Sequence, residues 1–116
     1  MRRKKEALGD CYEAAYKYIM REGISRDLIL VHAEVMGQGK IEGTTFGHAF
    51  VVDNSSQTAI DKSNGRDIEL PVSFYKMIGR IDDINNLFEY TRIQALDKSL
   101  ETGTYGPWEL VTKSGL

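Results

Sequence analysis

One stretch of nine residues, Leu28–Met36, constrains the fold more than any other part of the chain. It reads Leu-Ile-Leu-Val-His-Ala-Glu-Val-Met, which is far shorter than the roughly 20 apolar residues of a membrane span. It is rich in residues that favour strands, so we expect a central β-strand. Alternation along this strand places His32 and Glu34 on one face. An ordinary solvated polar face is the simpler interpretation of this pair, and a substrate groove is the alternative.

Other strand patterns follow this one. Residues 46–53 and 57–61 flank a turn of Asn54, Ser55 and Ser56, which predicts a hairpin. We expect short strands also at 67–70 and 87–90. Residues 37–45 hold three glycines and predict a loop, whereas the acidic pair Asp82-Asp83 is more typical of a turn than of a metal site.

Helical patterns precede and follow the strands. The first is expected at 10–22, with Asp10 as N-cap and Glu13 returning a bond to the cap. Gly23 is a natural residue to end it, and Cys11 would be its first residue. Pro71 is typical of a helix start, with Gly79 closing that helix. Further expected features are a helix at 91–101 capped by Thr91 and a packed aromatic clasp at 105–108.

The order of these elements predicts an α+β fold. We expect the N-terminal helix to pack on an antiparallel sheet of four or five strands, with further helices on that side or at the end. A length of 116 residues corresponds to one domain, 1–116, whose basic residues 1–6 form a flexible tail.

Charge and cysteine content narrow the function. The net charge is −2, and without the four basic residues at positions 2–5 the rest of the chain carries 11 basic against 17 acidic residues. A nucleic-acid-binding body is therefore disfavoured. The basic start has no apolar segment after it, so no secretory signal and no membrane association are expected. The single cysteine excludes an internal disulfide and a multi-cysteine zinc site, and it fits a reducing cytoplasm. We expect no metal and no cofactor.

Three residues in order carry the chemistry that we expect: Cys11, His48 and Asp61. A cysteine at a helix N-terminus is suited to nucleophilic attack, because the positive end of the helix dipole stabilises a thiolate. A nearby imidazole takes and returns the proton. A carboxylate on the other ring nitrogen fixes the orientation of the imidazole. The backbone N–H of Cys11 and a second donor, with Gln38 as a candidate, would stabilise the oxyanion.

The surrounding motifs resemble the transglutaminase-like branch of the papain-like cysteine peptidase superfamily. They are Gly9-Asp10-Cys11 opening a helix, His48-Ala49-Phe50-Val51, and Ile60-Asp61-Lys62-Ser63. The resemblance covers residues 9–65, about half the chain. Phe50 stands where the branch usually has Trp, and Lys62 where it usually has Pro. The resemblance implies a minimal papain-like core in which Cys11 is the nucleophile, His48 the base and Asp61 the orienting acid.

These motifs predict a thiol hydrolase that acts on a peptide or protein amide, or on a small amide or ester. Asp53 and Asn64 are weaker candidates for the acid. A non-catalytic binding or inhibitory protein on the same fold, of phage or mobile-element origin, is the alternative. A buried Cys11, or a His48 beyond hydrogen-bond reach, would favour that alternative. A further alternative is a regulatory or structural module in which the cysteine has no catalytic role. The oligomeric state does not follow from the sequence.

Overall fold

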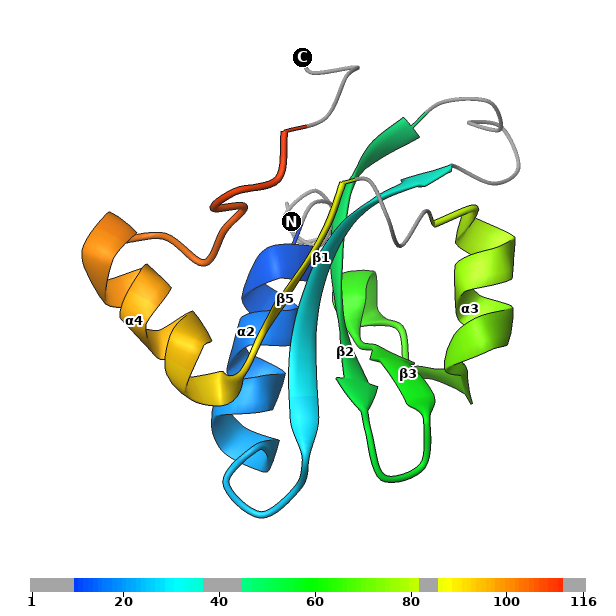
Figure 1. Ribbon diagram of the computed structural model, residues 1–116, viewed down its shortest axis with the longest axis horizontal. Coiled ribbons are helices and arrows are strands. Elements are labelled where there is room, and N and C mark those ends of the chain that lie inside the picture. Colours follow the sequence, from blue (N-terminus) through cyan, green and yellow to red (C-terminus); the bar gives the residue numbers. More distant parts are fainter. Residues whose placement is uncertain (1–9, 37–44, 82–85, 112–116) are drawn as a thin grey trace.

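The structure is a computed structural model that describes residues 10–36, 45–81 and 86–111 (Figure 1). It has the α+β architecture expected from the sequence. The elements in chain order are α2 (Cys11–Glu22), β1 (Leu28–Met36), β2 (Thr45–Asp53), β3 (Thr58–Asp61), the 3₁₀ turn η2 (Ser63–Gly65), β4 (Ile68–Pro71), α3 (Val72–Gly79), β5 (Leu87–Tyr90) and α4 (Arg92–Thr102). The predicted loop at 37–45 lies outside the described residues except for Thr45, and so do Gln38 and the pair Asp82-Asp83.

The strands form one antiparallel sheet in the order β4-β3-β2-β1-β5. β1 pairs with β2 along its whole length, from Leu28 opposite Asp53 to Met36 opposite Thr45. β5 pairs with β1 along its other edge. This confirms that the nine-residue apolar segment is an interior strand of the sheet.

Helices cover both faces of the sheet (Figure 1). α2 and α4 lie on one face, where the core is built from apolar side chains of α2, β1, β2, β3, β5 and α4. α3 lies on the other face, where Val72 and Tyr75 pack against a second cluster around Phe50. The expectation that all further helices lie on the side of the first one or at the end was therefore wrong for α3. The alternation of strand residues explains this, because Val31, Phe50 and Val52 point away from α2 and need a cover of their own.

The ends of the later helices follow local chemistry. Thr91 caps α4 as predicted, and a reciprocal bond joins the side chain of Gln94 to the backbone of Thr91. α3 extends through Gly79, and the residue with left-handed backbone geometry is Arg80. The prediction that Gly79 closes this helix was therefore one residue short. Among the described residues, no helix is long and apolar enough to cross a membrane.

Candidate active site

The nucleophile candidate lies at the start of α2. Cys11 is the first residue of this helix, as the sequence predicts, so its N–H is among those that no earlier helical carbonyl can bind. Asp10 occupies the N-cap position as predicted, but its side chain makes no capping bond. It accepts a hydrogen bond from the backbone N–H of Asn64 at 2.7 Å, while Glu13 bonds Lys17. Asp10 thus ties the thiol-bearing helix end to the turn that follows β3.

His48 and Asp61 meet because of the register of β2 and β3. Val51 lies opposite Ile60, which places Asp61 beside Phe50 on the face that His48 shares. The Nε2 atom of His48 lies 2.9 Å from Oδ2 of Asp61. β3 ends at Asp61, so the stretch of β2 that carries His48 has no β3 partner. This gap leaves room for the start of α2.

The Asp61 carboxylate is 2% exposed and accepts four hydrogen bonds. Oδ1 receives the backbone N–H and the hydroxyl of Ser63, at 2.9 and 2.6 Å. Oδ2 receives the Tyr75 hydroxyl at 2.6 Å in addition to His48. Burial alone would raise the pKa of Asp61, but these bonds and the adjacent imidazolium hold it well below its usual range. The carboxylate therefore stays ionised and fixes the imidazole.

Sequence reasoning missed the role of Tyr75. Tyr75 stands on α3 and reaches across the second face of the sheet to Asp61. Its ring packs on Phe50 at 4.6 Å between centroids. The available signal was the spacing of Val72 and Tyr75, which places both on the same side of a helix.

The Cys11 thiol lies close enough to the His48 imidazole to raise the pKa of the imidazole. Since Nε2 faces Asp61, Nδ1 is the ring nitrogen left for the sulfur. Burial opposes the positive charge on His48, but the interactions with Asp61 and Cys11 outweigh it and raise its pKa to about 9. The imidazole is therefore cationic at neutral pH.

The structure thus brings the three predicted residues together, with the His48 imidazole hydrogen-bonded to Asp61 and next to the Cys11 thiol. Both reactive side chains are nevertheless largely covered, with 6% of Cys11 and 8% of His48 exposed. A cavity of about 400 Å³ lies between the sheet and α3 and reaches His48 and Asp61.

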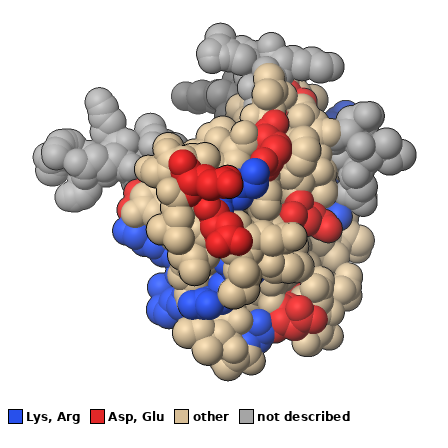
Figure 2. Space-filling view, turned by 60° about the vertical axis from the view of Figure 1, so that its left-hand side comes forward, with Lys and Arg blue, Asp and Glu red and all other residues tan. Residues whose placement is uncertain are grey.

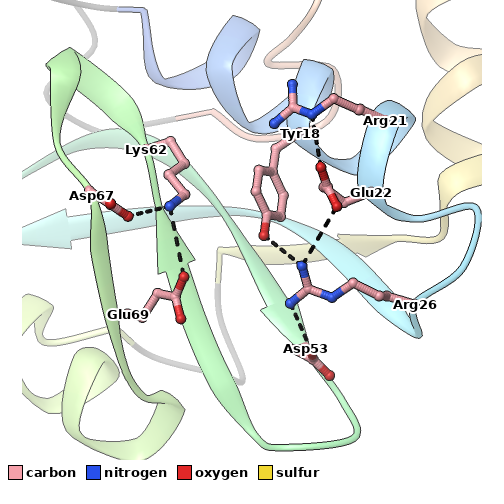
Figure 3. A network of polar contacts seen from close by, with 8 residues as sticks. All are labelled: Tyr18, Arg21, Glu22, Arg26, Asp53, Lys62, Asp67 and Glu69. Carbon is pink, nitrogen blue, oxygen red and sulfur yellow. Dashed lines mark hydrogen bonds and ion pairs between the residues drawn. The ribbon is translucent and has the colours of Figure 1, made fainter.

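The two weaker candidates for the acid are engaged elsewhere. Asp53 binds Arg26 at 3.0 Å and the backbone N–H groups of the following turn, at the far end of β2 (Figure 3). The backbone N–H of Asn64 goes to Asp10, and its side-chain oxygen is buried without a hydrogen-bond partner in the described part of the chain. Neither side chain bonds His48 among these contacts.

His32 is fully buried, so the expectation of a solvated face was wrong for this residue. Its ring lies about 5 Å from those of Tyr12, Tyr90 and Trp108. A side-chain carbon placed on Gly106 would come within 2.6 Å of it, so the predicted C-terminal clasp packs directly on the ring. The alternative role in a substrate groove has no support either, because α2 and the clasp enclose the ring.

His32 also differs from His48 in charge. Neither of its ring nitrogens has a hydrogen-bond partner within the described residues. Burial lowers the pKa of His32 to about 4, and the nearby Glu109 charge offsets this only in part. His32 is therefore a neutral core residue. Glu34, on the same strand face, is half-buried and accepts a hydrogen bond from Asn86 at 2.9 Å.

Within residues 10–36, 45–81 and 86–111, no cluster of three or more His, Cys, Asp or Glu side chains has a metal-binding arrangement. Comparisons of the chain with protein-family models, with curated proteins and with solved structures find no match. The features of this chain that bear on its function are therefore the geometry of the site and the resemblance of its motifs.

Proposed function

We propose that this protein is a cysteine-dependent acyl-transfer enzyme that hydrolyses an amide or ester bond with a Cys11–His48–Asp61 triad. The observation that carries the proposal is the 2.9 Å hydrogen bond between His48 and the buried, ionised Asp61 carboxylate, with the Cys11 thiol next to the same imidazole. The order of the motifs supports it, since each of the three residues occupies its place in the transglutaminase-like pattern.

In the proposed reaction, Sγ of Cys11 attacks the carbonyl carbon and forms a C–S bond. His48 gives its proton to the departing nitrogen or oxygen as the bond to the carbonyl breaks. A water molecule then attacks the thioester, and His48 accepts its proton and returns one to the sulfur. The N–H of Cys11, at the positive end of α2, is one donor for the oxyanion in both steps.

The proposed setting is the cytoplasm, where a lone cysteine stays reduced. The proposed substrate is a peptide or protein amide or a small amide or ester, without nucleic acid, membrane, metal or cofactor. Both signs of charge share the face shown in Figure 2, which favours a partner other than a polyanion.

The test is the formation of an acyl-enzyme. Incubation with p-nitrophenyl acetate should give a burst of p-nitrophenolate and a mass increase of one acetyl group on a peptide that contains Cys11. Cys11→Ser and His48→Ala should remove the burst, whereas His32→Leu, which changes the other histidine, should retain it. A wild-type protein that shows no acetylated Cys11 would contradict the proposal.

The second candidate is a non-catalytic binding or inhibitory protein on the same fold, of phage or mobile-element origin. The observation that favours it is the 6% exposure of Cys11, since a substrate carbonyl must reach the sulfur. If the protein is of this kind, no activated ester should acylate Cys11. Substitution of Cys11 by Ser should then destabilise the fold only as much as the same change at any small buried residue.

A further inference from the structure

The cavity between the sheet and α3 borders two of the three proposed catalytic residues, His48 and Asp61. Its walls are largely apolar side chains of the sheet and α3, together with His48 and Asp61. Its apolar lining residues include Val35, Phe46, Ile68, Leu70, Tyr75 and Ile78. Cys11 is not among the described residues that line it. Among the described residues, the cavity therefore borders the imidazole and not the thiol.

This position indicates which half of a substrate the cavity holds. The acyl half becomes bonded to Cys11, whereas the leaving group takes its proton from His48. A cavity that touches His48 but not Cys11 suits the leaving group. An apolar cavity of about 150 Å³ is enough for benzene, so about 400 Å³ accepts the side chain of a large apolar amino acid.

Arg66 adds a charge to this cavity. Its guanidinium lines the cavity, and the side chain is 50% exposed. Among the described residues its ion pair is with Asp61 at 3.9 Å, longer than a hydrogen bond. Asp61 already accepts four closer hydrogen bonds. The donors of Arg66 thus remain available for a carboxylate, which a guanidinium binds through paired hydrogen bonds.

We infer that the leaving group is the amine of a large apolar α-amino acid with a free carboxylate, so that the substrate is an N-acyl apolar amino acid or a peptide that ends in one. The apolar side chain fills the cavity beneath α3, the carboxylate pairs with Arg66, and His48 protonates the amine as the C–N bond breaks. This inference rests on the proposed hydrolysis by Cys11. Hydrolysis of one such amide consumes one water and releases a carboxylic acid and the amino acid.

The experiment compares hippuryl-phenylalanine with its C-terminal amide, hippuryl-phenylalaninamide, by the rate at which the C-terminal residue is released. For the wild-type protein kcat/KM should favour the free acid by about tenfold to a hundredfold, the range expected of a hydrogen-bonded ion pair. Arg66→Gln should reduce this ratio to near one. Arg21→Gln, an exposed arginine on α2 that pairs with Glu22, is the matched control and should keep the wild-type ratio.

A second comparison tests the cavity itself. Hippuryl-glycine has the carboxylate but no side chain, and its kcat/KM should be at least tenfold lower than that of hippuryl-phenylalanine. Acetylation of Cys11 by p-nitrophenyl acetate is measured in the same preparations. If Cys11 is acetylated but the acid, the amide and the glycine substrate react equally, the leaving-group inference is wrong and the hydrolase proposal stands. If Cys11 is not acetylated, both are wrong.

Discussion

The two histidines of this protein lie on neighbouring strands and have opposite chemistry. In the β1–β2 register His32 lies opposite Ala49, and His48 lies opposite Ala33. The two histidines are therefore at neighbouring positions of the paired strands, and their side chains point to opposite faces of the sheet. Both are buried. His48 faces a carboxylate and a thiol, and its pKa is raised to about 9. His32 lies among aromatic rings without a polar partner, and its pKa is lowered to about 4.

The comparison shows that burial alone does not make a histidine functional. Burial disfavours the imidazolium at both positions, and the neighbours decide whether that penalty is overcome. At His48 an ionised carboxylate with its own supporting hydrogen bonds overcomes it. At His32 the rings of Tyr12, Tyr90 and Trp108 supply packing and no compensating charge. Only the first arrangement can move a proton near neutral pH.

The largest effect is expected from removing the partnered histidine. His48→Ala should lower the hydrolysis of an ester or amide substrate by about 10²–10⁴-fold, the usual contribution of a general acid–base group. His32→Leu should change the rate by less than about threefold, because His32 lies on the face of the sheet away from the cavity. Steady-state kinetics on the two variants check this. Equal losses in both would remove the distinction between the two histidines.

The second prediction concerns a substitution that removes the carboxylate partner of His48, so that this histidine, like His32, is buried without a carboxylate bound to its ring. In Asp61→Asn the imidazolium loses its carboxylate while the burial of the ring remains, so the pKa of His48 should fall below its wild-type value of about 9. Titration of the imidazole proton resonances by NMR measures this directly. Asp53→Asn, which removes a carboxylate paired with Arg26 at the far end of β2, is the control and should leave the His48 titration unchanged.

The third prediction concerns the dependence of stability on pH. The folded-state pKa of His32 lies below its unfolded value near 6.5, so unfolding takes up a proton between pH 6.5 and 4. The free energy of unfolding should therefore fall by about 3 kcal/mol as the pH drops through this window. For His48 the pKa is raised, so its contribution is present below pH 6.5 and is lost as the pH rises toward 9.

Urea unfolding at a series of pH values tests these opposite slopes. The wild-type protein should be most stable near pH 6.5, and His32→Leu should flatten only the acid side. Asp61 also contributes to the pH dependence of stability. Because its pKa is lowered, its contribution is lost mainly below the unfolded carboxyl pKa near 3.9, which lies outside the pH range in which His32 titrates. An unchanged acid slope in His32→Leu would contradict the assignment of a neutral, unpartnered His32.

The smallest effect is expected from Tyr75→Phe. This change removes one of four hydrogen bonds to Asp61 and retains the ring contact with Phe50. A hydrogen bond to a charged group contributes about 1.5–3 kcal/mol, but three bonds remain and the carboxylate stays ionised. We expect a loss of about 1 kcal/mol in stability and a three- to tenfold decrease in kcat. Tyr16→Phe, whose hydroxyl bonds Ser99 away from the cavity, is the matched control for kcat.

The sequence was sufficient for the parts of this account that depend on local patterns. Alternation predicted the strands and the hairpin that carries His48 and Asp61, and the capping residue Thr91 was found from its local chemistry. The register that places His48 and Asp61 on one face came only from the structure. The sequence was not sufficient where a residue is defined by a distant contact. Asp10 is a good cap by residue type, yet it binds Asn64, 54 positions further on. His32 is polar, yet segments remote in sequence enclose it. Tyr75 reaches Asp61 only because α3 covers the second face of the sheet.

The most direct test of the central claim is the rate of Cys11 alkylation by iodoacetamide between pH 4 and 10, in wild type and in His48→Ala. At neutral pH the wild-type thiol should be alkylated faster than the thiol of His48→Ala, because the neighbouring imidazole takes up the thiol proton. That result would establish Cys11 and His48 as a thiolate–imidazolium pair. Slow alkylation with the same pH dependence in both proteins would contradict the account and favour the binding protein.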